Sequence, residues 1–142
     1  MTAYISLPMY SASIADRLRL LAGKCASCST LNYPPRQVCT GCGGTKFTEQ
    51  QLSGKGEIYT YTVIARGGAP AEFDEQQTLT GVITVGVVAL DEGPRVVGQI
   101  VDVAEGELAI GFRVHGVVRR LYDQEGIVRY GLKFAPELKK DA

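Results

Sequence analysis

Cys25-Ala-Ser-Cys28 and Cys39-Thr-Gly-Cys42 are the two segments that decide the fold of the N-terminal part of this 142-residue chain. Ten residues separate the two pairs. Each Cys-x-x-Cys pair forms a tight turn that brings its two sulfurs together. Two such turns that face each other give the four thiolates of a structural zinc site. We therefore expect residues 25–46 to form a zinc ribbon.

Two other uses of four cysteines compete with the zinc site. They are a pair of disulfides and a redox-active Cys-x-x-Cys motif. Disulfides are rare in the cytoplasm, and a redox motif normally stands alone beside a βαβ unit. A segment of about twenty residues buries little apolar surface, so metal binding is expected to supply most of its folding free energy, on the order of 10 kcal/mol.

Residues 1–24 are predicted to form an N-terminal helical segment. Ser13 and Asp16 have the spacing of a capping box, and Gly23 is placed to end a helix. Leu20 lies off the apolar face of this helix. The helix packs on its own domain or docks on a partner subunit. Its apolar face consists of Ile14, Leu18, Leu21 and Ala22.

Residues 54–136 have the pattern of a β-domain. Asp91-Glu-Gly-Pro94 is a turn signal between two apolar segments, and 67–78 is predicted to be a long acidic loop that serves as a contact surface or a flap. Five strands without an intervening helical pattern indicate an OB-type barrel or a compact sandwich, followed by a tail at 137–142. The expected strands are 56–66, 81–90, 95–101, 109–121 and 127–134.

The last two strands are predicted to have an apolar face and a basic face, because side chains alternate along a strand. A basic strip of this kind fits an anionic ligand, or else it is a solvated surface. The expected core positions are Phe112, Val114, Gly116, Val118, Val128, Tyr130, Leu132 and Phe134. The basic strip consists of Arg113, His115, Arg119, Arg129 and Lys133.

The charge of the chain limits its partners. Fifteen basic residues balance fifteen acidic ones, which argues against a general nucleic-acid coat or a polybasic membrane binder. Residues 51–110 carry a net charge of −6, whereas 1–50 and 111–142 each carry +3. No signal-peptide pattern and no membrane-spanning apolar run is evident, so a cytoplasmic location without membrane contact is expected.

Several motifs in this order resemble a zinc-ribbon/OB-fold family that is associated with acyl-CoA metabolism and was long described as a domain of unknown function. The resemblance covers about residues 12–136. Ser29 departs from it, since many such knuckles carry Gly after the second cysteine. Besides the cysteine pairs, the motifs are Tyr33-Pro-Pro-Arg36, Leu90-Asp-Glu-Gly-Pro94 and Tyr130-Gly-Leu-Lys-Phe-Ala-Pro136.

The resemblance implies a mainly β protein with an N-terminal helix, a rubredoxin-like zinc ribbon and a five-stranded OB-fold barrel. It further implies a non-catalytic subunit of a thiolase complex that degrades an aromatic, steroid or fatty acyl-CoA. In this interpretation the ribbon binds the catalytic subunit, and the barrel shelters the CoA thioester. The arginines of the basic strip would bind the phosphates of CoA. Other members accompany hydratases or aldolases.

The alternative function is a nucleic-acid-binding module, because zinc ribbons and OB barrels both bind RNA or DNA. The neutral charge of the chain disfavours it. An autonomous hydrolase is a third class, but the sequence shows no Gly-x-Ser-x-Gly motif, and the only histidine, His115, has no recognisable nucleophile partner.

Overall fold

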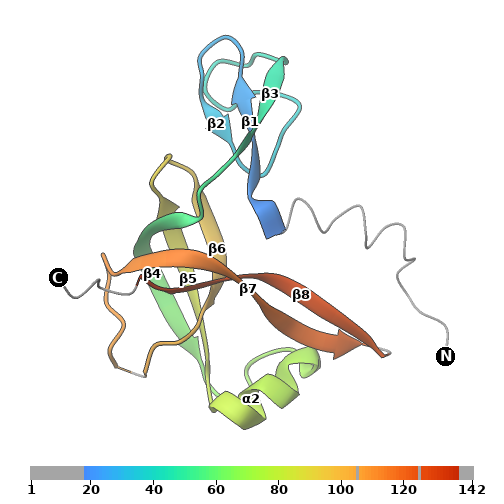
Figure 1. Cartoon of the computed structure of the whole chain (residues 1–142), viewed down its shortest axis with the longest axis vertical. Helices are drawn as coiled ribbons and strands as arrows, with labels where there is room; N and C mark the ends of the chain where they lie inside the picture. The colour runs from blue at the N-terminus through green and yellow to red at the C-terminus, as the bar shows by residue number, and fades with distance from the viewer. Residues whose placement is uncertain (1–17, 105, 125, 138–142) are drawn as a thin grey trace.

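A small three-stranded sheet stands beside a closed five-stranded barrel in the computed structural model of this chain (Figure 1). The structure describes residues 18–104, 106–124 and 126–137. Within these residues, no helix is long and apolar enough to cross a membrane.

The small sheet carries the cysteines and has the strand order β2-β1-β3. Its strands are β1 (Leu21–Cys25), β2 (Leu31–Asn32) and β3 (Phe47–Gln51). Strands β1 and β3 pair antiparallel along their whole length. The ribbon sheet therefore begins before the expected boundary at residue 25 and continues beyond residue 46.

The prediction that a helix continues to residue 24 is wrong from Leu21 onward. The backbone from Leu21 to Cys25 pairs with β3, and Gly23 lies in the middle of this strand rather than at a helix end. A helix there would remove those inter-strand hydrogen bonds. Leu18 and Arg19 are helical, as predicted, and residues 1–17, which hold the remainder of the predicted helix, lie outside the described residues.

Leu20 connects the ribbon to the barrel. It has a φ of 48° and is only 3% exposed, and its carbonyl accepts a hydrogen bond from the backbone N–H of Leu52 at 3.0 Å. The side chain belongs to the apolar cluster of the barrel. A helix would have exposed Leu20, whereas in this structure its side chain is buried where the ribbon meets the barrel.

The C-terminal part forms a closed barrel with the strand order β4-β5-β6-β8-β7. This confirms the predicted five-stranded OB-type barrel, and closure excludes the sandwich. The strands are β4 (Lys55–Ile64), β5 (Ile83–Leu90), β6 (Arg95–Ile100), β7 (Arg113–Gln124) and β8 (Ile127–Pro136). Each expected strand overlaps one of these.

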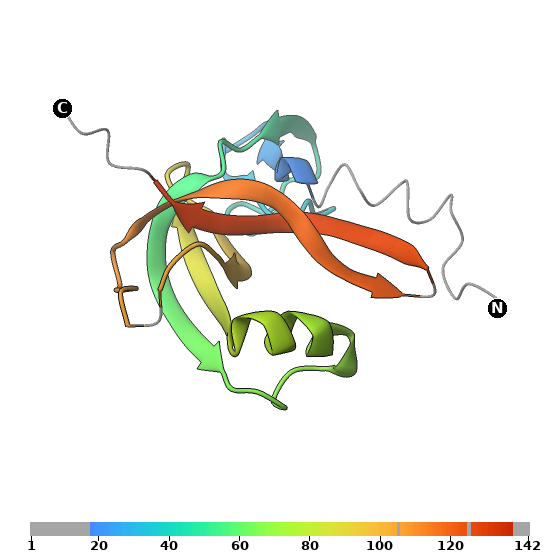
Figure 2. The same cartoon turned by 60° about the horizontal axis from the view of Figure 1, so that its bottom comes forward.

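The barrel closes over a short stretch only. Strands β6 and β8 are parallel and share one register pair, Ile100 with Phe134. Strand β4 pairs with β7 only at residues 55–57 and 113–115. Residues 117–124 and 127–133 therefore pair only with each other, and we call this outer part of the hairpin the arm (Figure 2).

The barrel core consists of aliphatic side chains and one phenylalanine. Its most deeply buried members come from four strands, and they include Val114 and Phe134 as predicted from strand alternation. The other two large side chains with almost no exposure are Ile58 and Val88.

The two faces of the arm are the reverse of the prediction for its outer half. Val118, Val128 and Tyr130 are 50%, 37% and 53% exposed, whereas Arg129 and Lys133 are 9% and 4% exposed. The side of β8 that was expected to face solvent faces inward here. The reason is that the arm extends past the barrel core, so its outward apolar residues have no second layer to pack against.

The predicted acidic loop at 67–78 is largely helical. It contains a 3-10 turn, η1 (Ala71–Phe73), and an α-helix, α2 (Asp74–Thr80). The only buried residue of α2 is Gln77, whose side-chain amide donates to the carbonyl of Ala65 at 2.9 Å. Because the buried contact of this helix is polar and Leu79 is 79% exposed, no apolar periodicity marks it in the sequence.

Gly56 is expected to be indispensable for barrel stability, because a Cβ atom there would collide with the carbonyl oxygen of Ala89 on β5. Gly56→Ala should lower the free energy of unfolding by about 1–3 kcal/mol, the usual effect of overpacking. Gly116→Ala is the control, since its Cβ would meet the flexible side chain of Leu132 at 3.1 Å. Urea denaturation followed by circular dichroism measures both. Equal midpoints for the two variants would contradict this account of the packing.

Candidate metal centre and ligand pocket

The four cysteine sulfurs converge on one point at the end of the ribbon. Their Sγ atoms all lie within 4.8 Å of one another. The Sγ atoms of Cys25 and Cys42 are 3.5 Å apart, and those of Cys28 and Cys39 are 3.6 Å apart. Zn–S bonds of about 2.3 Å in a tetrahedron require S···S distances of about 3.8 Å. The four cysteines therefore fit one tetrahedral metal ion, and they form a zinc-ribbon site.

Two matching backbone turns aim these sulfurs. In the first, the N–H of Ser29 donates to the carbonyl of Cys25 at 3.0 Å, and in the second the N–H of Gly43 donates to the carbonyl of Cys39 at 3.0 Å. Ser29 and Gly43 both have a left-handed backbone, with φ of 62° and 74°. Serine thus adopts a left-handed conformation that glycine reaches more easily.

Asn32 on β2 supports the second knuckle and was not recognised from the sequence. It is 2% exposed. Its Nδ2 group donates to the carbonyl of Thr30 at 3.2 Å and lies 3.6 Å from Sγ of Cys39, while its Oδ1 atom accepts from the N–H and the hydroxyl of Thr40, both at 3.0 Å. One amide therefore ties together both sides of the metal centre.

The hydrogen bonds around the sulfurs favour thiolates unequally. The backbone N–H of Cys42, the amide of Asn32 and the N–H of Gly41 lower the pKa of the Cys39 thiol to about 6. The N–H of Gly44 lowers the pKa of Cys42, but the neighbouring sulfurs of Cys28 and Cys25 outweigh it and raise that pKa to about 12. Four sulfurs at this spacing cannot all ionise without a cation between them.

Arg113 and His115, from the predicted basic strip, lie near the barrel end of β7. Arg113 binds Asp91 with two hydrogen bonds of 2.7 and 2.9 Å and lowers the pKa of that carboxyl group. It also contacts Glu137 at 3.4 Å. His115 is half-buried, and its imidazole has no hydrogen bond or ion pair with any residue that the structure describes. Neither side chain lines the pocket described below.

Arg129 is held against an aromatic ring on the arm. Its Nη1 group donates to the hydroxyl of Tyr122 at 3.4 Å, and its guanidinium carbon lies 5.5 Å from the centre of that ring. Its Nε atom is buried and has no hydrogen-bond partner among the described residues. The ring of Phe73 contacts Tyr122 edge-on, with ring centres 5.3 Å apart. The short helical segment therefore covers this end of the arm.

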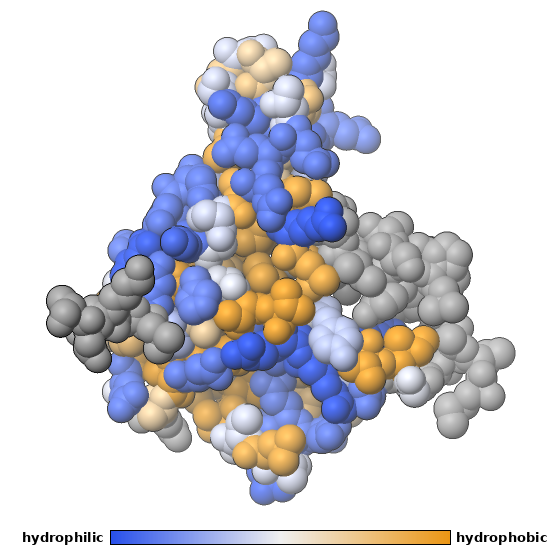
Figure 3. Space-filling model, viewed as in Figure 1, coloured by the Kyte–Doolittle hydropathy of each residue, from blue (hydrophilic) through white to orange (hydrophobic). Residues whose placement is uncertain are grey.

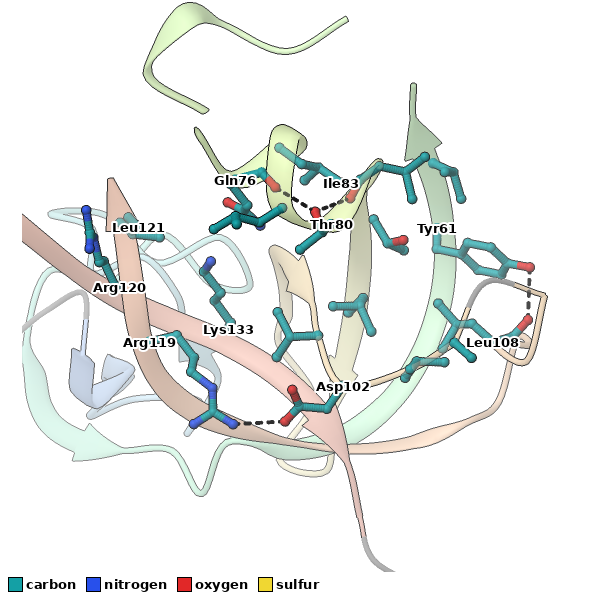
Figure 4. Close-up of a pocket in the computed structure, with 18 of the residues that line it drawn as sticks. Tyr61, Gln76, Thr80, Ile83, Asp102, Leu108, Arg119, Arg120, Leu121 and Lys133 are labelled. Atoms are coloured by element: carbon teal, nitrogen blue, oxygen red, sulfur yellow. Dashed lines mark hydrogen bonds and ion pairs between the residues drawn. The ribbon is translucent and has the colours of Figure 1, made fainter. Parts of the chain in front are cut away.

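A pocket of about 510 Å³ lies between the arm, helix α2, strands β4 and β5 and the segment after β6 (Figure 4). Arg119 and Lys133 of the predicted strip line it, together with Arg120, which was not in the strip. Arg119 pairs with Asp102 at 2.8 Å, and Arg120 pairs with Asp123 at 2.7 Å and with Glu75 at 3.4 Å. The structure thus brings part of the predicted strip into one site.

Lys133 lies at the inner wall of this pocket. Desolvation by burial lowers the pKa of its ammonium group, and the charge of Arg119 lowers it further. The remaining lining is largely aliphatic and includes Val63, Ile83, Ile100 and Leu121. Sequence periodicity could not reveal the pocket, because its walls come from five separate segments and one of them is the unrecognised helix.

The ribbon and the barrel together define the class of this chain, a zinc-ribbon/OB-fold protein. Family models of ChsH2 match both parts, the rubredoxin-like zinc ribbon domain over residues 12–48 and the C-terminal OB-fold domain over residues 49–119. A DUF35 domain-containing scaffold protein of Methanocaldococcus jannaschii is 37% identical over 126 residues, covering 87% of this chain and 85% of the relative. The chain therefore belongs to the ChsH2/DUF35 scaffold family.

Two further comparisons connect this family with enzymes. The chain is 33% identical over 100 residues to a probable enoyl-CoA hydratase alpha subunit of Thermomonospora curvata, covering 70% of this chain and 29% of that protein. It also resembles a chain of the solved Ltp2-ChsH2(DUF35) aldolase, with 26% identity, a TM-score of 0.66 and coverage of 95% and 98% of the two chains. The expected family is thus confirmed, whereas a thiolase partner is not.

Asn32→Ala is expected to loosen the metal centre. It removes a buried amide that makes several hydrogen bonds, so it should lower ribbon stability by about 1–3 kcal/mol. Zinc-loaded protein is mixed with a chromogenic chelator, and the rate of zinc release is measured. The variant should release zinc several-fold faster than wild type, and Thr48→Ala, an exposed change on β3, should not. Unchanged release from Asn32→Ala would show that the amide does not support the site.

Proposed function

We propose that this chain is the non-catalytic subunit of a thiolase-type complex that degrades an aromatic, steroid or fatty acyl-CoA. The four ribbon cysteines would hold one structural Zn²⁺. The ribbon and the arm would contact the catalytic subunit, and the barrel would shelter the CoA thioester. The observation that carries this proposal is the likeness to scaffold proteins over nearly the whole chain.

The chemistry of the described residues agrees with a non-catalytic role. All four cysteines point to one metal centre, so none is available as a nucleophile. His115 is not hydrogen-bonded to a serine, cysteine or carboxylate within the described residues. A nucleophile and a base within hydrogen-bond reach are the basis of acyl transfer. Ser53 does donate to the carboxylate of Glu92, but this pair is exposed and lies outside the pocket. The bond-making residues would therefore come from the partner.

The outer face of the arm supports docking on that partner. We define this face by the exposed side chains of Val118, Val128 and Tyr130. Figure 3 shows an apolar patch over β7 and β8, below the ribbon and visible from the same side. Contiguous apolar patches on a surface mark protein contacts. One enzyme surface could thus contact both the ribbon and the arm.

The arginines at the pocket mouth support binding of CoA phosphates. Arg119 and Arg120 have side chains that are each 47% exposed, and their carboxylate partners are also exposed. Exposed ion pairs contribute only about 0–1 kcal/mol, so a phosphate can replace the carboxylate at little cost. Arg113 is less suited, because Asp91 occupies its guanidinium with two short bonds.

The docking proposal predicts that Tyr130→Ser weakens capture of the catalytic subunit. Removing this half-exposed ring should reduce the affinity about tenfold if it lies in the interface centre. The tagged chain is produced in its native host, and the co-purified thiolase-type subunit is quantified by mass spectrometry. Tyr59→Ser is the matched control, since Tyr59 is also half-exposed but lies on β4 under Arg95. Equal losses in both variants, or no enzyme with wild type, would contradict the proposal.

The CoA proposal predicts that Arg119→Ala and Arg120→Ala each weaken binding of CoA by about 1–3 kcal/mol, as for charge-assisted phosphate contacts. Calorimetry with CoA measures the effect, and Arg113→Ala is the control. Wild-type affinity in both pocket variants would move the cofactor to another surface. Tighter binding of single-stranded oligonucleotides than of CoA at the same salt concentration would favour the nucleic-acid alternative.

A further inference from the structure

The pocket beside the arm has an apolar interior that the folded chain leaves uncovered. Several of its lining side chains belong to the exposed apolar residues of the protein, among them Tyr61, Val63 and Leu79. Its volume of about 510 Å³ lies in the range of sites for small organic molecules. Apolar surface of this kind costs free energy in water, and an apolar ligand would remove that cost.

Two of the three cations that line the pocket already have carboxylate partners. Arg119 is paired with Asp102, and Arg120 is paired with Glu75 and Asp123. The one remaining acidic group of the lining, Glu72, is exposed on the 3-10 turn at the mouth. The charges at the mouth are therefore balanced largely among themselves.

Lys133 is the exception. The residue as a whole is only 4% exposed, and its side chain makes no hydrogen bond or ion pair with any described residue. Figure 4 shows its ammonium group between Arg119 and Gln76, on the side of the hollow. Among the described residues, the fully buried side-chain atoms without a hydrogen-bond partner are Gln76 Oε1 and Arg129 Nε, so the ammonium group of Lys133 still opens to the hollow. An anion bound in the pocket would pair with this otherwise unpaired cation.

Gln76 adds a second unsatisfied polar group on the same pocket wall. Its Nε2 group donates to Oε1 of Gln99 at 2.8 Å, but its own Oε1 atom is buried and has no hydrogen-bond partner among the described residues. Buried polar atoms without partners are rare in folded proteins and call for an explanation. The free Oε1 atom of Gln76 can only accept a hydrogen bond, so it does not bind a carboxylate, and Lys133 is the group on this wall that can compensate one. The lining also carries the polar side chains of Thr80 and Thr84 beside its aliphatic ones.

We propose that this pocket binds an alkanoate, with the carboxylate on the ammonium group of Lys133 and the alkyl chain along the aliphatic wall. A single unpaired monovalent cation matches one carboxylate, whereas a phosphate dianion requires more positive charge than this wall supplies. The carboxylate site and the phosphate contacts proposed for Arg119 and Arg120 share one pocket, with Lys133 on its inner wall and the two arginines at its mouth. The carboxylate site depends neither on a catalytic partner nor on CoA.

Calorimetry on the full zinc-loaded chain with three ten-carbon probes tests the proposal. Wild type should bind decanoate more tightly than 1-decanol, and decyltrimethylammonium least, because only the carboxylate compensates Lys133. This ranking needs no variant and so does not depend on the folding of one. Absence of decanoate binding at millimolar concentration, or equal affinity for the anionic and cationic probes, would overturn the proposal.

Lys133→Met tests the residue itself, since it keeps most of the side-chain volume and removes the charge. It should weaken decanoate binding about tenfold and leave 1-decanol within about twofold of wild type. Lys55→Met is the matched control, because Lys55 is exposed on β4 and lies outside the pocket. If Lys133→Met binds decanoate as wild type does, the carboxylate site is elsewhere and the proposal fails.

The carboxylate could belong to a free acid or to the far end of an acyl group on CoA. The CoA monothioester of sebacic acid carries the same carboxylate, so its affinity relative to decanoate distinguishes the two sources. Decanoate binding has to depend on Lys133 for the proposal to stand, whatever the outcome of CoA binding at the arginines. Given that dependence, tighter and equally Lys133-dependent binding of the monothioester would assign the carboxylate to an acyl group on CoA, and weaker binding would assign it to a free acid.

Discussion

The closure of the barrel by a single parallel register pair, Ile100 with Phe134, is the constraint on which the rest of the structure depends. Phe134 is buried in the core, and its carbonyl accepts a hydrogen bond from the backbone N–H of Val101 at 2.8 Å. These two contacts set the register of β8 against β6. Because β6 and β8 form no further register pairs, the outer parts of β7 and β8 pair only with each other and extend beyond the barrel. The arm then has an outer face without a covering layer and an inner face over a hollow. Both the docking surface and the pocket that we propose follow from this one feature of the sheet.

Gly98 and Gly131 show how side-chain size permits this geometry. A Cβ atom on Gly98 would lie 2.9 Å from the ring of Phe134, and one on Gly131 would lie 2.7 Å from Cδ1 of Leu121. The first glycine lets β6 approach the core phenylalanine at the closing point. The second lets Leu121 fold across β8 next to the pocket. Small residues therefore stand at the closing point of the barrel and within the arm, and larger ones would push the strands apart.

Local signals predicted the parts of this fold that depend on local chemistry. Cysteine spacing fixed the metal ligands, because a Cys-x-x-Cys turn is geometrically self-contained, and strand periodicity located all five barrel strands. The faces of the arm could not be predicted, since alternation tells which residues share a side but not which side is inward. Val118 and Tyr130 were assigned to a core that ends before them. Helix α2 was missed because Gln77, its one buried residue, is held by hydrogen bonds rather than by apolar packing.

The basic side chains of the arm are suited to two different kinds of ligand group. Arg119 and Arg120 are solvated and paired with carboxylates that an incoming anion can displace, so they suit a large, hydrated group that binds and leaves from the mouth. Lys133 lies one strand away on β8, without a partner among the described residues and mostly removed from water. A cation in that position gains most from a small anion attached to an apolar body, because only such a ligand compensates the charge and fills the hollow at once. A scaffold subunit built in this way would contribute to the recognition of a ligand even though it supplies no bond-making residue.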